Sequence, residues 1–586
     1  MTRIAVIEKE KCNPEGCGNF LCIRVCPINK SGEECIVKGE DGKPVINEEM
    51  CTGCGICVHR CPYGAISVIN LPEELTEKPI HQYGKNGFHL YNLPTPIFGK
   101  VVGILGKNGI GKSTAIKVLA GVLEPNLGDI EKEKANYGEL IEYFKGTEAQ
   151  LFFEKVKDKE IKIAYKLQQV DLIPRTTKGK VIDLLKNVDE KKQLDKITKE
   201  LGIEKILDND ITKISGGELQ RVAIAATVLK KANLYIFDEP TSYLDIKQRL
   251  KVAKFIRDLA DEKTAVMVVE HDLIILDYMA ELVHLMYGKE AVYGIVSLPK
   301  ATKAGINVYL EGYLKEQNIR FRDYKIKFEA KPLIKKKSEF LLTSWKDIEK
   351  KLGKFKLEAK EGSIFKKEVC GILGENGIGK TTFVRILAED IKQDKGEITQ
   401  KVKVSYKPQY LDAASDELVA NVLQKAIQKY SAAVINPLNI KPLLMRKVSE
   451  LSGGELQRVA IALCLGQDAD LYLLDEPSAY LDVEQRLVVS KVIKELMELK
   501  GKSALVVAHD LLFIDYLSQN LIVFDGEPAL YGKVNGPFGM EEGMTMFLKE
   551  LGITFRRDEE SHRPRANKVG SVKDREQKSK NKYYYS

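Results

Sequence analysis

ISGGELQRVAIA, residues 214–225, returns almost unchanged as LSGGELQRVAIA at residues 451–462. Three further motifs are duplicated in the same order: GKNGIGKST (106–114) as GENGIGKTT (374–382), YIFDEPTSYLD (235–245) as YLLDEPSAYLD (472–482), and VVEHDL (268–273) as VVAHDL (506–511). A fixed order of motifs that occurs twice indicates two homologous domains. In each copy apolar strand segments alternate with helical segments, which predicts an α/β domain around a largely parallel sheet.

The earliest motif of each copy is a phosphate-binding loop, preceded by an apolar strand segment and followed by a helix. Its glycines let backbone N–H groups approach phosphates, its lysine reaches the β- and γ-phosphates, and the next hydroxyl suits Mg²⁺. The predicted nucleotide-binding residues of the two loops are Gly106, Asn108, Gly109, Gly111, Lys112, Ser113, Thr114, Gly374, Asn376, Gly377, Gly379, Lys380, Thr381 and Thr382.

Each DEP motif ends an apolar strand with two acids. The aspartate is predicted to hold Mg²⁺ and the glutamate to polarise the attacking water, while a histidine after the next apolar strand can reach the γ-phosphate. A glutamine from YKLQQ or YKPQY can bridge metal and water. The predicted Mg²⁺ ligands are Ser113, Gln168, Asp238, Thr381, Gln409 and Asp475, and the predicted catalytic residues are Glu239, His271, Glu476 and His509.

The SGGELQ segments place a serine and two glycines at a predicted helix N-terminus, which is an anion site without a phosphate of its own. Together these motifs resemble the ATP-binding cassette family. The resemblance implies that each such segment caps the ATP held by the other copy, so that two ATP molecules join the halves and hydrolysis releases them. The capping residues are then Ser215, Gly216, Gly217 and Glu218 for one site, and Ser452, Gly453, Gly454 and Glu455 for the other.

The two copies differ at one position beside the predicted catalytic histidines, where Glu270 has Ala508 as its counterpart. We therefore expect the two sites to hydrolyse ATP at different rates. The sequence does not indicate which site is faster.

Nine of the eleven cysteines precede residue 62, in a chain whose first residues show no secretory signal, so we expect metal rather than disulfides. The second group has the C-x₂-C-x₂-C-x₃-C-P spacing of bacterial ferredoxins, whose fourth cysteine ligates the other cluster. Two [4Fe-4S] clusters are predicted, with zinc as the alternative because the first group departs from ferredoxin spacing. The predicted ligands are Cys12, Cys17, Cys22 and Cys61 for one cluster, and Cys51, Cys54, Cys57 and Cys26 for the other.

Three cysteines remain outside this scheme. Cys35 is a spare thiol or an alternative ligand, and no role is assigned to it. Cys370 and Cys464 lie in apolar segments, where we expect buried small side chains.

The net charge of +8 is concentrated in two segments. Residues 312–337 hold nine Lys/Arg against three acids, and residues 555–586 hold ten against five. NIRFRD (318–323) in the first echoes ITFRRD (553–558) in the second, which indicates paired hinges. A localised polyanion contact would need such segments, although solvated linkers have the same composition. The predicted RNA-contacting residues are Arg320, Arg322, Arg556 and Arg557.

The first copy is about 31 residues longer than the second between its phosphate loop and its SGGELQ segment. We predict a helix-loop-helix insertion near 132–160 that contacts a partner. Thr147 and Gln150 suit a capping box for its second helix. The expected apolar stripes are Leu140, Ile141 and Phe144 on one helix, and Leu151, Phe152 and Val156 on the other.

Three functions were weighed for this arrangement: a transporter ATPase, an ATP-driven iron–sulfur electron-transfer protein, and an ATPase that separates a nucleic-acid-containing assembly. No apolar segment reaches the roughly 18 residues that a membrane span needs, so a cytoplasmic protein is expected. The electron carrier leaves the twin ATPase copies and the basic hinges unexplained. The third function uses all of these features.

The order of cysteine head, first copy with its insertion, RFRD hinge, second copy and FRRD hinge resembles the subfamily E ATP-binding cassette proteins, also called the RNase L inhibitor family. This resemblance implies splitting of 70S- or 80S-type ribosomes with a class-one release factor or Pelota, after which the factor stays on the small subunit until ATP is hydrolysed. It also implies that the head swings as the ATPase copies close, that the protein acts as a monomer, and that Tyr83 and Phe88 stack on the first adenine and Phe355 on the second.

The domain organisation expected from these observations has five parts. They are a ferredoxin-like α+β domain (1–75), a first P-loop nucleotide-binding domain (76–311), a first hinge (312–337), a second nucleotide-binding domain (338–545), and a second hinge with a basic tail (546–586).

Overall fold

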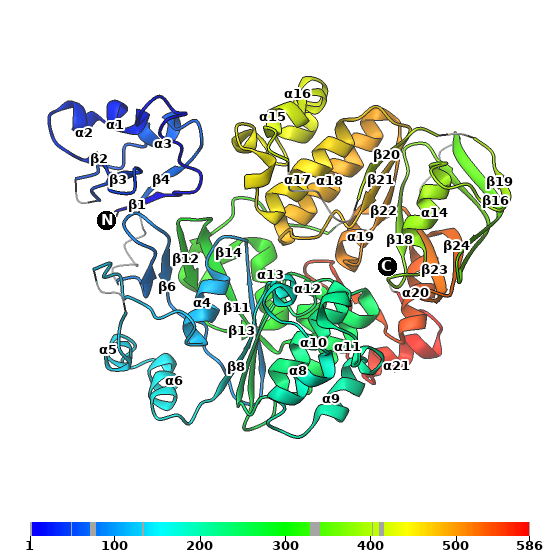
Figure 1. Cartoon of the computed structure of the whole chain (residues 1–586), viewed down its shortest axis with the longest axis horizontal. Coiled ribbons are helices and arrows are strands. Elements are labelled where there is room, and N and C mark those ends of the chain that lie inside the picture. The colour runs from blue at the N-terminus through cyan, green and yellow to red at the C-terminus, as the bar shows by residue number, and fades with distance from the viewer. Residues whose placement is uncertain are drawn as a thin grey trace.

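The computed structural model describes residues 3–48, 50–70, 78–131, 134–328, 340–400, 402–408 and 415–584. A small N-terminal head lies beside two larger α/β domains, and the C-terminal segment, red in Figure 1, runs between those two domains. This is the predicted multi-domain fold, and the prediction is confirmed. The expected boundaries near residues 75 and 337 lie outside the described residues.

The head, residues 3–70, is built on short elements around sulfur-rich packing. Its strands form two antiparallel pairs: β1 (Arg3–Ile7) with β4 (Ile66–Asn70), and β2 (Ile36–Lys38) with β3 (Pro44–Ile46). Its helices are α1 (Leu21–Val25), α2 (Pro27–Lys30) and α3 (Ile56–Arg60). Buried cysteines pack with Ala5, Ile7, Ile36, Ile46 and Ile66 in a core that is too small to be stable without further cross-links.

The first α/β domain contains one sheet, in the order β5-β6-β12-β11-β7-β10-β9-β8, with β13 beside β11. Strands β11, β7, β10, β9 and β8 run parallel. The strands are β5 (His81–Gln82), β6 (His89–Tyr91), β7 (Val101–Gly106), β8 (Ile163–Lys166), β9 (Leu234–Asp238), β10 (Ala265–Val269), β11 (Leu282–Lys289), β12 (Tyr293–Val296) and β13 (Lys300–Ala301). Its main helices are α4 (Lys112–Leu119), α8 (Val181–Val188), α9 (Leu194–Leu201), α10 (Gly216–Val228), α11 (Ile246–Arg257), α12 (Leu273–Met279) and α13 (Thr302–Glu311).

The second α/β domain repeats this topology, with the sheet order β19-β16-β17-β24-β23-β18-β22-β21-β20. The strands are β16 (Leu341–Leu352), β17 (Phe355–Phe365), β18 (Val369–Leu373), β19 (Lys395–Ile398), β20 (Val404–Lys407), β21 (Leu471–Asp475), β22 (Ser503–Val507), β23 (Asn520–Glu527) and β24 (Tyr531–Gly539). Its main helices are α14 (Lys380–Leu387), α16 (Gln424–Tyr430), α17 (Gly453–Gly466), α18 (Val483–Lys500), α19 (Leu511–Leu517) and α20 (Met540–Leu551). The parallel order β23-β18-β22-β21-β20 matches β11-β7-β10-β9-β8, as expected of duplicated domains.

The central parallel strands of both sheets are buried, so they read as continuous apolar segments. Every residue of β7, β9 and β10 is buried, as is every residue of β18, β21 and β22. Cys370 and Cys464 are buried among these apolar side chains, as predicted. Because the strands of each sheet are parallel, their carboxyl ends share one edge, and the chemically important motifs follow those ends.

The insertion in the first domain consists of helices α5 (Tyr137–Tyr143) and α6 (Glu148–Lys157). The predicted capping box at Thr147 is wrong: the Thr147 hydroxyl donates to the Phe144 carbonyl, and Gln150 accepts from the Gly146 amide. A capping box occurs instead at the start of α5, between Asn136 and Glu139.

The predicted stripe of α6 is also partly wrong. Leu151 is exposed, whereas Phe152 and Phe153 are buried against α5. The run LFF holds three adjacent apolar residues, so the helical period alone could not select which two of them face inward.

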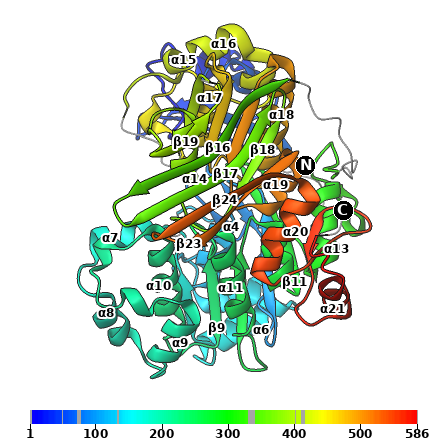
Figure 2. The same ribbon diagram turned by 90° about the vertical axis from the view of Figure 1, so that its right-hand side faces the viewer.

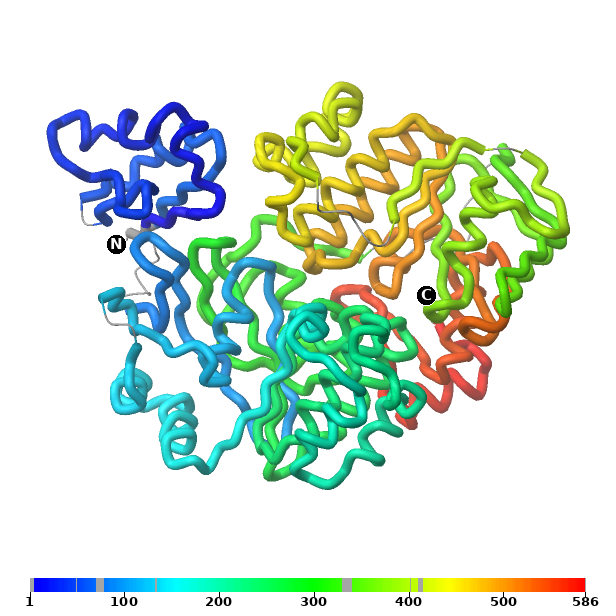
Figure 3. The backbone as a smooth tube through the Cα atoms, in the orientation of Figure 1, coloured from blue at the N-terminus to red at the C-terminus, as the bar shows by residue number. Residues whose placement is uncertain are grey.

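The C-terminal segment fastens the two α/β domains to each other. Strands β25 (Phe555–Arg557) and β26 (Pro564–Ala566) pair beside α12 and α19, and helix α21 (Val572–Ser579) follows. Helix α20 packs on β23 and β24 of the second domain. Figure 2 shows α21 beside the first domain, and the tube in Figure 3 passes from the second domain to the first. In the described part of the chain, no helix is long and apolar enough to cross a membrane.

Candidate functional site

Each phosphate-binding loop connects a central strand to a helix: β7 leads to α4, and β18 leads to α14. Gly111 and Gly379 precede these helices with φ of 87° and 97°, a backbone conformation that favours glycine. The buried Lys112 ammonium donates to the Gly106 carbonyl over 3.0 Å, and Lys380 donates to Gly374 over 2.8 Å. Each ammonium therefore lies over its own loop, where a nucleotide phosphate would replace these carbonyls.

The predicted metal ligands meet at the adjacent strand ends. In the second domain the Thr381 hydroxyl donates to Asp475 Oδ2 over 3.0 Å. In the first domain, Ser113 and Asp238 form the corresponding pair. Burial raises the pKa of Asp238, and the hydrogen bond from Ser113 opposes that rise. A hydroxyl and a carboxylate at this separation offer the hard oxygen ligands that Mg²⁺ prefers.

Glu239 and Glu476 both have left-handed backbones, with φ of 47° and 50°. Such strain in non-glycine residues concentrates at functional sites. His271 Nε2 lies 3.5 Å from Glu239 Oε1, and His509 Nε2 lies 3.2 Å from Glu476 Oε1. Gln168 donates to Glu239 Oε1 over 2.7 Å, whereas Gln409 lies outside the described residues.

The two glutamates differ in their electrostatic surroundings. Burial favours a raised pKa at Glu239, but the His271 hydrogen bond and the Lys112 charge outweigh burial and lower the pKa to about 2. Burial raises the pKa of Glu476 to about 7, although Arg249 and Lys380 oppose the rise. The same burial lowers the pKa of His509 well below its usual range. The two carboxyl groups therefore differ in direction: the pKa is lowered at Glu239 and raised at Glu476.

Glu270, the residue that the second domain replaces with Ala508, braces the first site. Its carboxylate accepts from the Thr241 hydroxyl over 2.6 Å and from the backbone amides of His271 and Asp272 over 2.8 and 3.2 Å. The backbone that carries the histidine is thus held by a side chain in the first site, and Ala508 offers no such acceptor.

The SGGELQ segments begin helices α10 and α17, as predicted. Ser215 and Ser452 are the N-caps, and each forms a capping box with the glutamate three residues later, Glu218 or Glu455. The backbone N–H groups of the intervening glycines, Gly216 and Gly217 or Gly453 and Gly454, lie in the first helical turn, where a helix favours an anion.

The two α/β domains contact each other through the phosphate loops. The Asn108 amide donates to Asp482 Oδ2 over 3.0 Å, and the Asn376 amide donates to Asp245 Oδ2 over 3.3 Å. Asp245 and Asp482 were quoted in the duplicated DEP motifs, but sequence reasoning gave them no role. Their identity in both copies was the available signal.

Aromatic rings lie against both phosphate loops. A Cβ on Gly111 would meet the Phe88 ring at 2.6 Å, and one on Gly379 would meet the Phe355 ring at 2.8 Å. Tyr83 is half exposed, and its hydroxyl lies 3.3 Å from the Thr114 hydroxyl. All three predicted adenine-stacking residues therefore lie beside the loops that would hold the phosphates.

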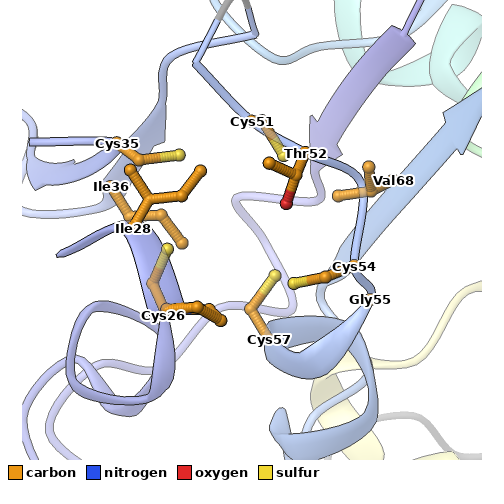
Figure 4. Close-up of a pocket in the computed structure, with 11 residues that line it drawn as sticks. Cys26, Ile28, Cys35, Ile36, Cys51, Thr52, Cys54, Gly55, Cys57 and Val68 are labelled. Carbon is orange, nitrogen blue, oxygen red and sulfur yellow. The ribbon is translucent and has the colours of Figure 1, made fainter. Parts of the chain in front are cut away.

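In the head, Cys26, Cys51, Cys54 and Cys57 line one cavity, with Cys35 as a fifth thiol (Figure 4). Figure 4 shows the sulfur atoms of Cys26, Cys54 and Cys57 directed into the space between the chain segments. These are the four cysteines that crossed ligation assigns to one cluster, so the donor set and its enclosing shape fit an iron–sulfur group.

The other predicted set also gathers in one place. Burial raises the pKa of Cys12, and neighbouring thiols that include Cys61 and Cys17 add to the rise. Burial raises the pKa of Cys22 to about 12, with Cys12 and Cys17 among its neighbours. Among the described residues, no three His, Cys, Asp or Glu side chains are grouped closely enough to hold a single metal ion.

The head is anchored to the first domain by Asn86, between the aromatic residues Tyr83 and Phe88. Asn86 accepts from the Ile46 amide over 2.8 Å and donates to the Ile46 carbonyl and Glu48 over 3.0 and 2.9 Å. Its carbonyl also accepts from the Ile7 amide over 2.6 Å. The same loop thus borders the first phosphate site and holds the head.

Two of the four predicted RNA-contacting arginines form ion pairs with carboxylates of the protein itself. Arg322 is 4% exposed and donates to Glu484 over 2.8 Å. Arg557 donates to both oxygens of Asp515 over 2.8 and 3.0 Å. We therefore withdraw Arg322 and Arg557 as free cationic contacts.

Arg320 is exposed, with its guanidinium over the Tyr313 ring, and Arg556 is partly exposed. These two remain predictions. The structure thus divides the four arginines by their ion pairs, which their shared motif could not do.

This geometry defines a twin-domain ATPase with an iron–sulfur head. A family model described as "ABC transporter" matches residues 98–242 and 357–479. Models described as "4Fe-4S binding domain" and "Possible Fer4-like domain in RNase L inhibitor, RLI" match residues 44–67 and 2–34. The chain therefore has two ATPase domains that bind ATP with Mg²⁺, and a 4Fe-4S-binding head.

Full-length relatives identify the family. An uncharacterized ABC transporter ATP-binding protein of Methanocaldococcus jannaschii is 53% identical over 100% of this chain and 97% of its own length. Translation initiation factor RLI1 of Saccharomyces cerevisiae is 43% identical over 100% of this chain and 98% of its own. The chain belongs to the subfamily E ATP-binding cassette family, the RNase L inhibitor family.

Two solved structures are similar to it. The structure titled as a model of ribosome-bound archaeal Pelota and ABCE1 contains a chain that matches with a TM-score of 0.93, at 53% identity, over 100% of this chain and 99% of that one. A crystal structure of archaeal ribosomal stalk protein aP1 with archaeal ribosome recycling factor aABCE1 matches with a TM-score of 0.82, at 53% identity, over 88% of this chain and 100% of that one.

Proposed function

We propose that this protein is a ribosome-recycling ATPase that splits 70S- or 80S-type ribosomes into subunits after termination or rescue. The observation that carries the proposal is the match over the whole chain to the partner of ribosome-bound archaeal Pelota, head included. Pelota or a class-one release factor is then the cooperating partner, and the protein stays on the small subunit until ATP is hydrolysed. Its site of action is the cytoplasm, and it works as a monomer.

The ATP sites are composite in this proposal. Lys112, Ser113 and Asp238 bind one ATP and its Mg²⁺, and the segment from Ser452 to Glu455 caps it; the second site exchanges the domains. The contacts of Asn108 with Asp482 and of Asn376 with Asp245 support this pairing, because they set each phosphate loop against the opposite domain. Glu239 and Glu476 orient the attacking water, and His271 and His509 reach the γ-phosphate.

The head is the moving part of the proposed mechanism. Two [4Fe-4S] clusters, one on each set of four cysteines, would stiffen a domain with little apolar core. Because Asn86 links the head to the loop that carries Tyr83 and Phe88, a rearrangement around the first adenine reaches the head directly. Arg320 and Arg556 supply the remaining predicted RNA contacts. The proposed domains are residues 1–75, 76–311, 312–337, 338–545 and 546–586.

The test is a sedimentation profile of ribosomes with the purified protein, Pelota or a release factor, and ATP. Loss of the intact ribosome peak, with the protein in the small-subunit fraction when Glu239 and Glu476 are both replaced by Gln, supports the proposal. An intact peak under all conditions refutes it. A mild reductant that alters splitting while the clusters persist would favour the electron-transfer alternative.

A further inference from the structure

Two ion pairs join the α/β domains at equivalent places, and their charges are inverted. We use "loop position" for the residue after the first glycine of the phosphate loop, which is Lys107 in the first domain and Glu375 in the second. We use "turn position" for the second residue after Asp245 or Asp482, which is Lys247 in the first domain and Glu484 in the second. The first domain thus carries lysine at both positions, and the second carries glutamate at both.

Both loop positions are paired across the domain interface. Lys107 Nζ lies 2.8 Å from Glu484 Oε2, and Lys247 Nζ lies 2.6 Å from Glu375 Oε1. Each pair flanks one of the backbone contacts to Asp482 or Asp245, so it lies beside a phosphate loop. The Glu484 side chain is only 8% exposed, while Lys247 is 56% exposed.

The backbone contacts that flank these pairs use the same residue types in both domains, so those contacts would accept either domain as a neighbour. Asn108 and Asn376 are equivalent, as are Asp245 and Asp482. If two first domains met through this surface, Lys107 would face Lys247; if two second domains met, Glu375 would face Glu484. Like charges placed opposite each other penalise the wrong partner, which is how interfaces gain specificity.

We propose that these four residues are the determinants that make each ATPase domain accept the unlike domain and reject a second copy of itself. The partner that fits the first domain's surface presents glutamate at both positions, and the partner that fits the second presents lysine at both. This inference rests on the proposed closure of the two domains around ATP. It assigns these four charged residues a role in partner choice, separate from the phosphate chemistry that the two domains share.

The pair Lys247–Glu375 offers the cleaner test, because Glu484 also accepts from Arg322 over 2.8 Å. Lys247→Glu creates the facing charges of two second domains, and Glu375→Lys creates those of two first domains. Each new residue is the one that the other domain already carries at that position, so both backbones accommodate it. Lys145→Glu is the matched charge-reversal control, since Lys145 is exposed and pairs with Glu142 inside the insertion.

The experiment uses the full chain with Glu239→Gln and Glu476→Gln, so that hydrolysis does not interfere. Closure is followed by small-angle X-ray scattering as ATP is titrated. We expect Lys247→Glu and Glu375→Lys each to raise the ATP concentration at half closure roughly three- to tenfold. The combined Lys247→Glu/Glu375→Lys variant should need less ATP than either single variant, because the ion pair is re-formed with its charges exchanged.

Salt gives a second readout. The difference between each single variant and the parent in the ATP concentration at half closure should decrease as NaCl rises from 0.1 to 0.5 M. The reason is that the Debye length shrinks from about 10 Å to about 4 Å, which screens the like charges. The proposal is overturned if the single variants close like the parent, or if the combined variant needs as much ATP as the worse single variant. Normal closure without ribosome splitting overturns only the proposed function, whereas a parent that never closes with ATP overturns both.

Discussion

The unequal pKa values of Glu239 and Glu476 predict that acidification silences one ATP site before the other. The perturbation is a change from pH 8 to pH 6 in two variants that each keep one base. Glu476→Gln leaves the first site with Glu239, and Glu239→Gln leaves the second site with Glu476. A carboxyl group acts as base only when ionised, so a raised pKa removes the base as pH falls through it.

The magnitude follows from the two pKa values. With a pKa of about 7, Glu476 is ionised in about ten of eleven molecules at pH 8 and in about one of eleven at pH 6. With a pKa of about 2, Glu239 is ionised throughout this range. The kcat/KM of the second site should therefore fall roughly tenfold relative to that of the first.

The assay is steady-state phosphate release at low ATP, because kcat/KM reports the free enzyme. Taking the ratio of the two variants cancels the titration of ATP itself, which both share. The Glu239→Gln/Glu476→Gln variant supplies the background rate. Parallel pH profiles for the two single-base variants would show that burial of Glu476 does not control its proton, and the reasoning would fail.

Three further predictions concern the parts around the ATP sites. Asn86→Gly keeps the left-handed backbone but removes the side-chain bonds to Ile46 and Glu48; we expect faster hydrogen exchange in residues 3–70 and weaker ribosome splitting. Arg557→Met leaves Asp515 buried without its cation, which should speed exchange over 553–567 more than tenfold for a cost of about 3 kcal/mol; adding Asp515→Asn should reverse most of it. Removing iron with a chelator should lower the far-UV circular dichroism of the head, while ATP binding by the α/β domains stays unchanged.

The phosphate loops and DEP strands could be predicted from sequence because their chemistry is local. Gly111, Lys112 and Asp238 each act within a few residues of a strand end, and the duplication provided an internal check. The gathering of Cys26, Cys51, Cys54 and Cys57 at one cavity could also be predicted, from the ferredoxin spacing of the second cysteine group; the crossed ligation of two clusters stays a prediction. The sequence did not predict that Cys35 lies beside Cys26 and Cys51, because that position depends on how β2 packs.

Long-range partners were the part that sequence reasoning missed. Arg322 and Arg557 belong to basic segments, yet each pairs with a buried carboxylate more than forty positions away in the sequence, at Glu484 and Asp515. Charge patterning reports how many cations a segment holds, but not which acids the fold brings to them. The capping box predicted at Thr147 does not form because the Thr147 hydroxyl donates back to the Phe144 carbonyl of the preceding turn, a bond that the sequence motif does not encode.

The strap formed by β25 and β26 constrains how the protein can move. Arg565 donates to both oxygens of Asp277 on α12 over 2.6 and 3.0 Å, and Arg557 holds Asp515 at the equivalent place on α19. One short hairpin thus forms ion pairs with equivalent aspartates of both domains, close to the contact between α12 and α19. A motion that keeps these bonds leaves Asp277 and Asp515 close to the hairpin, so the two halves stay together where α12 and α19 meet. When the two domains move relative to each other, the displacement is therefore smallest near Asp277 and Asp515 and larger at the outer edges of the two sheets.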